Sequence, residues 1–305
     1  MNGLRRRLLI QLGLAAIVSL ALGAQTRDAD AVLREMRTAL GGDAALDAVK
    51  TLSVSGSVNH SLGGRSHGSS LEMFVMLPDH FLEVQRSSSM VTGPVRLDIE
   101  TTNYFGFRGD ILIRRTDSTF PVPPDPGAQT PAAIAARERD YLQRNKREFA
   151  RLTLALFGRS FAGALFSYIG PEVIDKQATE VIEVRETDGS VMRLYVNQAT
   201  HLPALIAWQA PPAAIVITTA TSTAVVRGGQ VMSQTPPTFD PTGPPAPVLP
   251  DVTWRMVFSD FKVQDSLNWP HRMKEMMGAQ VTQDTRLGKF KLNPKIDARK
   301  FNIGR

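Results

Sequence analysis

Residues 51–58, TLSVSGSV, and residues 71–85, LEMFVMLPDHFLEVQ, carry the pattern that decides the fold. In both stretches apolar side chains alternate with other residues at a period of two, and the alternation continues through residues 95–100. Turn residues separate the runs at Gly63-Gly64, Pro78-Asp79, Gly93-Pro94 and Gly109-Asp110. This pattern is typical of consecutive antiparallel strands. We therefore expect residues 51–115 to form a sheet whose apolar face is buried under another layer.

Helical periodicity flanks this strand region on both sides. Asp28 or Asp30 can cap a helix that ends near Leu40, and a short helix over 43–49 follows. A long helix is predicted from Pro131 to about Gly158. One of its faces carries residues spaced by three or four positions, namely Tyr141, Asn145, Phe149, Leu152 and Leu156. This helix is the best candidate to cover the sheet, and residues 154–169 are either buried on several sides or form a lid.

Strand patterns resume over 181–226 and again over 254–292. Residues 187–190 are typical of a hairpin turn, and Pro270 indicates an edge position or a bulge in its strand. Helices grouped apart from a run of strands favour an α+β fold with an antiparallel sheet curved over helices. The proline-rich stretch 233–251 reads as an inserted loop, because the same strand pattern follows it. Residues 25–305 are therefore expected to form a single domain.

The first 24 residues are typical of a secretory signal peptide. Arg5, Arg6 and Arg7 precede an apolar run, and the run ends in small residues. Cleavage is expected near Gly23 or Ala24, which would place the protein in the periplasm. An uncleaved membrane anchor is the alternative, although the run is short for a bilayer span. The three arginines are compatible with export by the general secretory pathway and by the twin-arginine pathway.

Charge and cysteine content narrow the function classes. The net charge of the chain is +6, and residues 286–305 carry most of the basic excess. This basic C-terminal tail is either a solvated segment or a contact for anionic lipid head groups at a membrane surface. The chain has no cysteine, which excludes disulfides, thiolate metal ligands and lipidation after the signal. Nucleic acid is not an expected partner, because basic and aromatic residues do not interleave.

No constellation of residues predicts catalysis, so we predict neither an enzyme nor a metal or cofactor site. The five histidines lack the spacing of metal ligands, and neither a nucleophile elbow nor a phosphate-binding glycine motif is present. The strand carboxylates Glu72, Glu83, Asp98 and Glu100 alternate with apolar residues. The period of two therefore predicts that these four carboxylates point to solvent.

The remaining candidate site is the apolar face of the sheet. It is either a packed core or the lining of a cavity for an acyl chain or another apolar ligand. Methionine is well suited to adaptable apolar sites. The predicted ligand-binding residues are Met73, Val75, Leu82, Val84, Leu97, Ile99, Phe105, Phe107, Trp208, Trp254, Met256 and Phe258.

Both ends of the chain resemble a known superfamily. The residues concerned are Leu40-Gly41-Gly42 with residues 49–56 at the start, and residues 258–261, 269–273, 290–297 and Phe301 at the end. These segments resemble an uncharacterised exported bacterial branch of the LolA/LolB superfamily of periplasmic lipoprotein carriers. The resemblance implies an unclosed antiparallel half-barrel, with helices as a lid over a cavity for acyl chains. No family site residue can be matched to a position in this sequence.

Two functions remain open. The first is a periplasmic carrier that binds lipid or lipoprotein acyl chains. The alternative is a non-catalytic envelope sensing or scaffolding module whose edge strands bind a protein partner.

Overall fold

The computed structural model describes residues 27–62, 65–91, 97–119, 130–161, 163–212, 214–218, 223–227, 230–233 and 250–303. The predicted signal peptide and residues 234–249 of the proline-rich stretch lie outside this part of the chain. None of the helices within the described residues combines the length and the hydropathy needed to cross a bilayer.

A single 12-stranded antiparallel sheet dominates the fold. Its strands, in spatial order, are β5 (Ile111–Ser118), β4 (Leu97–Arg108), β3 (His80–Val91), β2 (Arg65–Met76), β1 (Thr51–Leu62), β15 (Gln280–Leu292), β14 (Leu267–Met277), β13 (Val252–Gln264), β9 (Pro203–Ala210), β8 (Val191–Asn197), β7 (Gln177–Glu186) and β6 (Ala164–Ile174). The first strand therefore lies between the second and the last strand of the chain. A separate three-stranded sheet contains β10 (Ala214–Thr218), β11 (Thr223–Arg227) and β12 (Gln230–Ser233).

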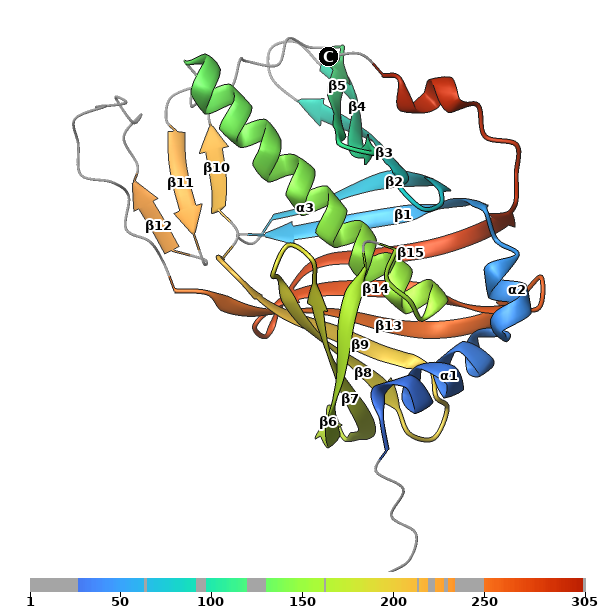
Figure 1. Ribbon diagram of the computed structural model, residues 1–305. Coiled ribbons are helices and arrows are strands. Elements are labelled where there is room, and N and C mark those ends of the chain that lie inside the picture. The colour runs from blue at the N-terminus through green and yellow to red at the C-terminus, as the bar shows by residue number, and fades with distance from the viewer. Residues whose placement is uncertain are drawn as a thin grey trace, which may run out of the picture.

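The large sheet is curved and not closed, because β5 and β6 remain as its two edges. Its concave face is covered by the long helix α3 (Pro131–Phe157), which crosses the strands, and by α1 (Ala29–Leu40) and the short α2 (Asp43–Asp47) (Figure 1). This arrangement confirms the predicted fold class, an α+β unclosed half-barrel covered by helices.

Local sequence explains where the helices begin and end. Asp28 caps α1 by accepting a hydrogen bond from the backbone N–H of Ala31. Thr130 caps α3 in the same way, and Pro131 occupies the first turn, where its missing N–H costs nothing. Gly158 ends α3 in a left-handed conformation, with φ of 63°. The predicted bounds of both helices are confirmed.

Three segments differ from the sequence-based interpretation. Residues 154–169 do not act as one unit, because α3 ends at Phe157 and residues 164–174 form the edge strand β6. Within the predicted strand region 213–226, the described residues 214–218 and 223–226 do not join the main sheet but belong to the small one. Pro270 lies in an interior strand, yet β14 pairs with β15 only from Arg272 onward, so Pro270 has a strand neighbour on one side alone.

Both faces of the sheet carry apolar clusters. The main core lies between the concave face and the helices, and includes Met36 of α1, Val54 of β1 and Phe157 of α3. A smaller cluster on the convex face is covered by the C-terminal segment, whose 3-10 helix η1 (Ala298–Phe301) buries Phe301 against it. Part of the predicted basic tail is therefore packed onto the fold.

One glycine shows why close strand packing fixes residue type. A Cβ atom on Gly106 of β4 would lie 2.0 Å from the backbone oxygen of Phe81 on β3. Glycine within a strand can mark a bulge, a bend or a close approach of another backbone, and at Gly106 it marks a close approach.

Candidate functional site

The candidate site is a small cavity between α3 and the concave face of the sheet. Its volume is about 20 Å³, which is enough for about one water molecule. It is lined by Leu71, Met73, Phe81, Glu83, Glu148, Leu152, Met256, Met273, Glu275, Gln283 and Thr285. The site thus combines apolar walls with three carboxylates from three elements: β3, α3 and β14.

The structure brings most of the predicted ligand-binding residues to the concave face. Met73, Val75, Phe107, Met256 and Phe258 are buried in the main core, and Trp208 packs against it. Among the predicted residues, Met73 and Met256 line the cavity itself.

Three more predicted residues share this face at the periphery of the core. Ile99 and Phe105 alternate in step with Phe107 on β4 and are half-buried. Trp254 stacks on Trp208, with ring centroids 6.3 Å apart. The side chain of Leu97 lies outside the described residues.

Leu82 and Val84 do not lie on the concave face, contrary to the sequence-based expectation. Leu82 is paired with Phe74 of β2, and both belong to the convex cluster with Val84 and Phe301. Phe81 and Leu82 are adjacent and both apolar, so the period of two could be read in either register. The C-terminal segment that buries Leu82 is more than 200 positions away in the chain, and periodicity carries no information about it.

The prediction that Glu83 points to solvent is wrong for the same reason, because its side chain points into the core. Only 8% of its surface is exposed. The Gln85 side-chain amide donates to Glu83 Oε1 over 2.6 Å, and Nε2 of His60 lies 3.1 Å from Oε1 of Gln85. Glu72, Asp98 and Glu100 are on the surface, as predicted.

Burial dominates the electrostatics of the three carboxylates. It raises the pKa of Glu83 to about 8, with the charge of Glu148 as the next cause. Burial also raises the pKa of Glu275 to about 7, and the Arg151 and Arg144 guanidinium groups oppose this rise. The pKa of Glu148 is raised by burial in the same way. The sequence offers little signal for these carboxylates: Glu275 stands between Met273 and Met277 in its alternating row, whereas Glu83 is followed in its row by the polar Gln85.

Arg151 of α3 supplies the positive charge of the site. The sequence placed it on the polar face of the helix, but its guanidinium carbon lies 4.0 Å from the ring centroid of Trp208. Burial lowers the pKa of Arg151, and the charges of Glu148 and Glu275 counter this effect. Its Nε is buried and has no hydrogen-bond partner among the described residues. The two tryptophans and this arginine close one end of the concave face.

The two halves of α3 are attached to the sheet in different ways. The second half contributes Phe149, Leu152 and residues 154–157 to the core. The polar contacts lie at the middle of the helix: the Asn145 side-chain amide donates to the Gly106 backbone oxygen over 3.1 Å, and Lys146 pairs with Asp110 at 2.5 Å. Residues 131–144, the first half of α3, are exposed or half-buried.

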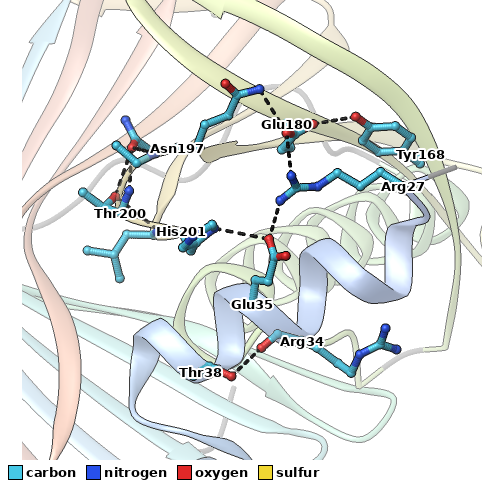
Figure 2. A network of polar contacts seen from close by, with 12 residues as sticks. Arg27, Arg34, Glu35, Thr38, Tyr168, Glu180, Asn197, Thr200 and His201 are labelled. Carbon is cyan, nitrogen blue, oxygen red and sulfur yellow. Dashed lines mark hydrogen bonds and ion pairs between the residues drawn. The ribbon is translucent and has the colours of Figure 1, made fainter. Parts of the chain in front are cut away.

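A second polar cluster fixes the start of α1 to the far edge of the sheet, and Figure 2 shows its contacts. Arg27 pairs with Glu35 on α1 and lies 3.2 Å from Glu180 on β7. Glu180 is 4% exposed and accepts hydrogen bonds from Tyr168 at 2.5 Å and Gln198 at 3.0 Å. All of its charged partners are accounted for, so this cluster has a structural role.

The cavity has the chemistry of a binding site. Within the described ranges no group of three or more potential ligands could hold a metal ion. The walls offer apolar contact and three carboxylates whose pKa values burial raises, and the Arg151 guanidinium group lies on the neighbouring Trp208 ring.

Comparisons with known proteins give similarity of structure alone. No family model matches the sequence, and no curated protein matches it. A DUF1329 family protein from Desulfovibrio piger has a TM-score of 0.43 at 9% identity, over 90% of this chain and 96% of the other. A LolA superfamily protein from Nitrosomonas europaea has a TM-score of 0.43 at 10% identity, over 90% and 97%. A putative outer membrane lipoprotein-sorting protein domain from Vibrio parahaemolyticus has a TM-score of 0.40 at 9% identity, over 85% and 93%.

Proposed function

We propose that the protein is an exported, periplasmic carrier that binds lipid or lipoprotein acyl chains between α3 and the concave face of the sheet. The observation that supports this most directly is the large apolar concave face, which one long helix crosses. Burial of each CH₂ group contributes roughly 0.8 kcal/mol, so an acyl chain needs no polar anchor to bind there.

In this proposal, the small cavity corresponds to a closed state of the carrier. Ligand pockets have volumes of about 300–1,000 Å³, whereas the cavity measures about 20 Å³. An acyl chain enters only when α3 moves away from the sheet. The exposure of its first half, the polar contacts at its middle and the apolar packing of its C-terminal part favour a lid that opens at the Pro131 end and pivots near Gly158.

A crosslink across the lid tests this mechanism. The chain has no native cysteine, so Asp110→Cys with Lys146→Cys gives a unique pair joined by a short bis-maleimide. We expect the crosslinked protein to lose binding of a fluorescent twelve-carbon acyl probe, and the uncrosslinked double variant to keep it.

A matched pair at the fixed end of the helix serves as the control. Arg159 lies 3.0 Å from Asp47 of α2, and a crosslink between cysteines at these positions leaves the first half of α3 free. If the uncrosslinked protein binds no acyl probe by fluorescence or native mass spectrometry, the carrier function is wrong. If both crosslinked proteins bind equally, the lid assignment is wrong.

A second candidate function has its own support. The edge strand β6 exposes Leu165, Ile169 and Val173, with 71%, 51% and 72% of their surfaces accessible. An edge strand with large apolar side chains can add a strand from a protein partner. This supports the sensing or scaffolding alternative, and Leu165→Lys with Val173→Lys would weaken partner capture without changing acyl-probe binding.

A further inference from the structure

The convex face of the sheet carries a row of cations on β15. Arg286, Lys289 and Lys291 are all exposed there. Their strand neighbours Leu287 and Phe290 are buried on the concave side. Gly288 is the extra residue of a bulge in the β1–β15 pairing, and it keeps Lys289 and Lys291 on the same face as Arg286. We refer to these three residues as the basic row.

Each member of the basic row lies opposite a serine of β1. The cross-strand pairs are Ser57 with Arg286, Ser55 with Lys289 and Ser53 with Lys291. Because serine side chains are short, the three long cationic side chains lie beside a shallow surface of serine hydroxyl groups. Serine hydroxyls donate hydrogen bonds to anions, and arginine and lysine supply charge-assisted ones.

This serine surface continues into a wider groove at the Arg286 end of the basic row. The groove has a volume of about 620 Å³ and is lined by backbone and small side chains of β1, β2 and β3, with Arg86 of β3 and with Arg286 and Asp284 of β15. Ser57, Ser70 and Ser88 contribute hydroxyl groups, and Gly68 has open space where a side chain would be. A groove with two guanidinium groups and several hydroxyls matches the recognition chemistry of a phosphate group.

The nearby acids pair mainly with cations outside the basic row, although the charge of Arg286 also helps to lower the pKa of Asp284. Asp284 forms two hydrogen bonds with Arg272, at 2.9 and 2.5 Å, and Glu72 pairs with Arg86 at 2.5 Å. Within the described part of the chain, none of the three cations of the row forms an ion pair of its own. Like charges on adjacent positions repel each other, and an anionic partner relieves that repulsion.

We infer that the basic row and its groove bind the phosphate groups of an anionic lipid surface. The extended row favours an array of phosphates over a single free ion, because its members follow one strand for six residues. The helices cover the opposite face, so this contact leaves the lid α3 free. The inference therefore goes beyond the proposed carrier function and does not depend on it.

Co-sedimentation with lipid vesicles tests the inference. The mature full-length protein is mixed with vesicles of phosphatidylcholine alone or with added phosphatidylglycerol, at low and high salt. We expect binding to the anionic vesicles alone and loss of binding at high salt. A triple variant, Arg286→Ser with Lys289→Ser and Lys291→Ser, should reduce the apparent affinity on the order of 100-fold, because each cation near the surface contributes several-fold.

Two controls make the result specific. A second triple variant removes the same charge from exposed positions elsewhere: Arg139→Ser, Arg185→Ser and Arg193→Ser. It should bind vesicles like the wild type; an equal loss in both variants would show a net-charge effect and overturn the inference. Thermal unfolding and acyl-probe binding of both variants should match the wild type, which separates this test from that of the carrier function.

Inorganic phosphate at matched ionic strength distinguishes the two sources of phosphate. If millimolar phosphate abolishes vesicle binding and sodium chloride of the same ionic strength does not, the groove takes the soluble ion and the lipid assignment is wrong. Equal effects of the two salts support the lipid surface.

Discussion

Glu83 on β3 and Glu148 on α3 line one cavity from opposite sides, and the charge of Glu148 raises the pKa of Glu83. The interface between the sheet and the helix that covers it therefore contains two acids that resist simultaneous ionisation. Closure of the helix favours their protonated forms. The first prediction concerns this linkage.

We expect the free energy of unfolding to fall as the pH rises from about 4.5 to about 8. The pKa of Glu83 is about 8 in the folded state against an ordinary value of 4.5, so the folded state holds a proton that the unfolded state has lost over this range. The stabilisation that this proton provides is fully present below the pKa of the unfolded state. It decreases as the pH rises, with a slope of about 1.4 kcal/mol per pH unit and proton. Glu83→Gln should reduce this slope in urea unfolding.

Glu72→Gln is the matched control for that measurement. Glu72 faces solvent on the neighbouring strand and pairs with Arg86, so its removal should leave the slope between pH 5 and pH 8 unchanged. A wild-type stability that rises with pH over this range would contradict the protonated state of Glu83.

The second prediction concerns Arg151. Its charge lowers the pKa values of Glu148 and Glu275. Arg151→Gln should therefore destabilise the protein more at pH 8, above the pKa of about 7 of Glu275, than at pH 5. Leaving buried charge without its partner costs about 3–5 kcal/mol. Arg151→Lys keeps the charge and should show a smaller difference between the two pH values in thermal unfolding.

The third prediction compares two buried residues on opposite faces of the sheet. Met73 and Leu82 are 2% and 1% exposed, so Met73→Ala and Leu82→Ala should each destabilise by about 2–5 kcal/mol. We expect weaker acyl-probe binding in the Met73 variant alone, because Leu82 packs under the C-terminal segment. Equal probe affinity in both variants would place the ligand outside the concave face.

The fourth prediction concerns the attachment of α1. Arg27→Met removes the charged partner of buried Glu180 and should cost about 1–3 kcal/mol, a value reduced by the partial exposure of Arg27. The amides of α1 should then exchange hydrogen faster. Arg34→Met, on the same helix, changes a side chain without an ion pair in the described residues and should leave exchange unchanged.

Periodicity predicted the elements of the fold well because most of them alternate or repeat against a single core. The strands of residues 51–115 and helix α3 have their predicted places. It failed at β3, where Phe81 and Leu82 are both apolar and both buried. The choice of face there depends on Phe301, which arrives from the other end of the chain.

The candidate site was predicted only in part for a related physical reason. The rule that strand carboxylates point to solvent holds for Glu72, Asp98 and Glu100, but not for Glu83. Burial raises the pKa of Glu83, and the charges of Glu148 on α3 and Glu275 on β14 raise it further. The members of this cluster are distant in the sequence and meet only in the folded protein, so no local sequence pattern predicts the cluster.

The position of β1 between β2 and β15 has a consequence for how the chain reaches its final form. During synthesis or secretion from the N-terminal end, β2 is available to β1 early, whereas β15 emerges after almost the whole polypeptide. Until β15 is present, one edge of β1 in the middle of the sheet is unpaired. A chain truncated before residue 280 leaves this edge unpaired. A quality-control protease that recognises unpaired strands would therefore degrade incomplete chains.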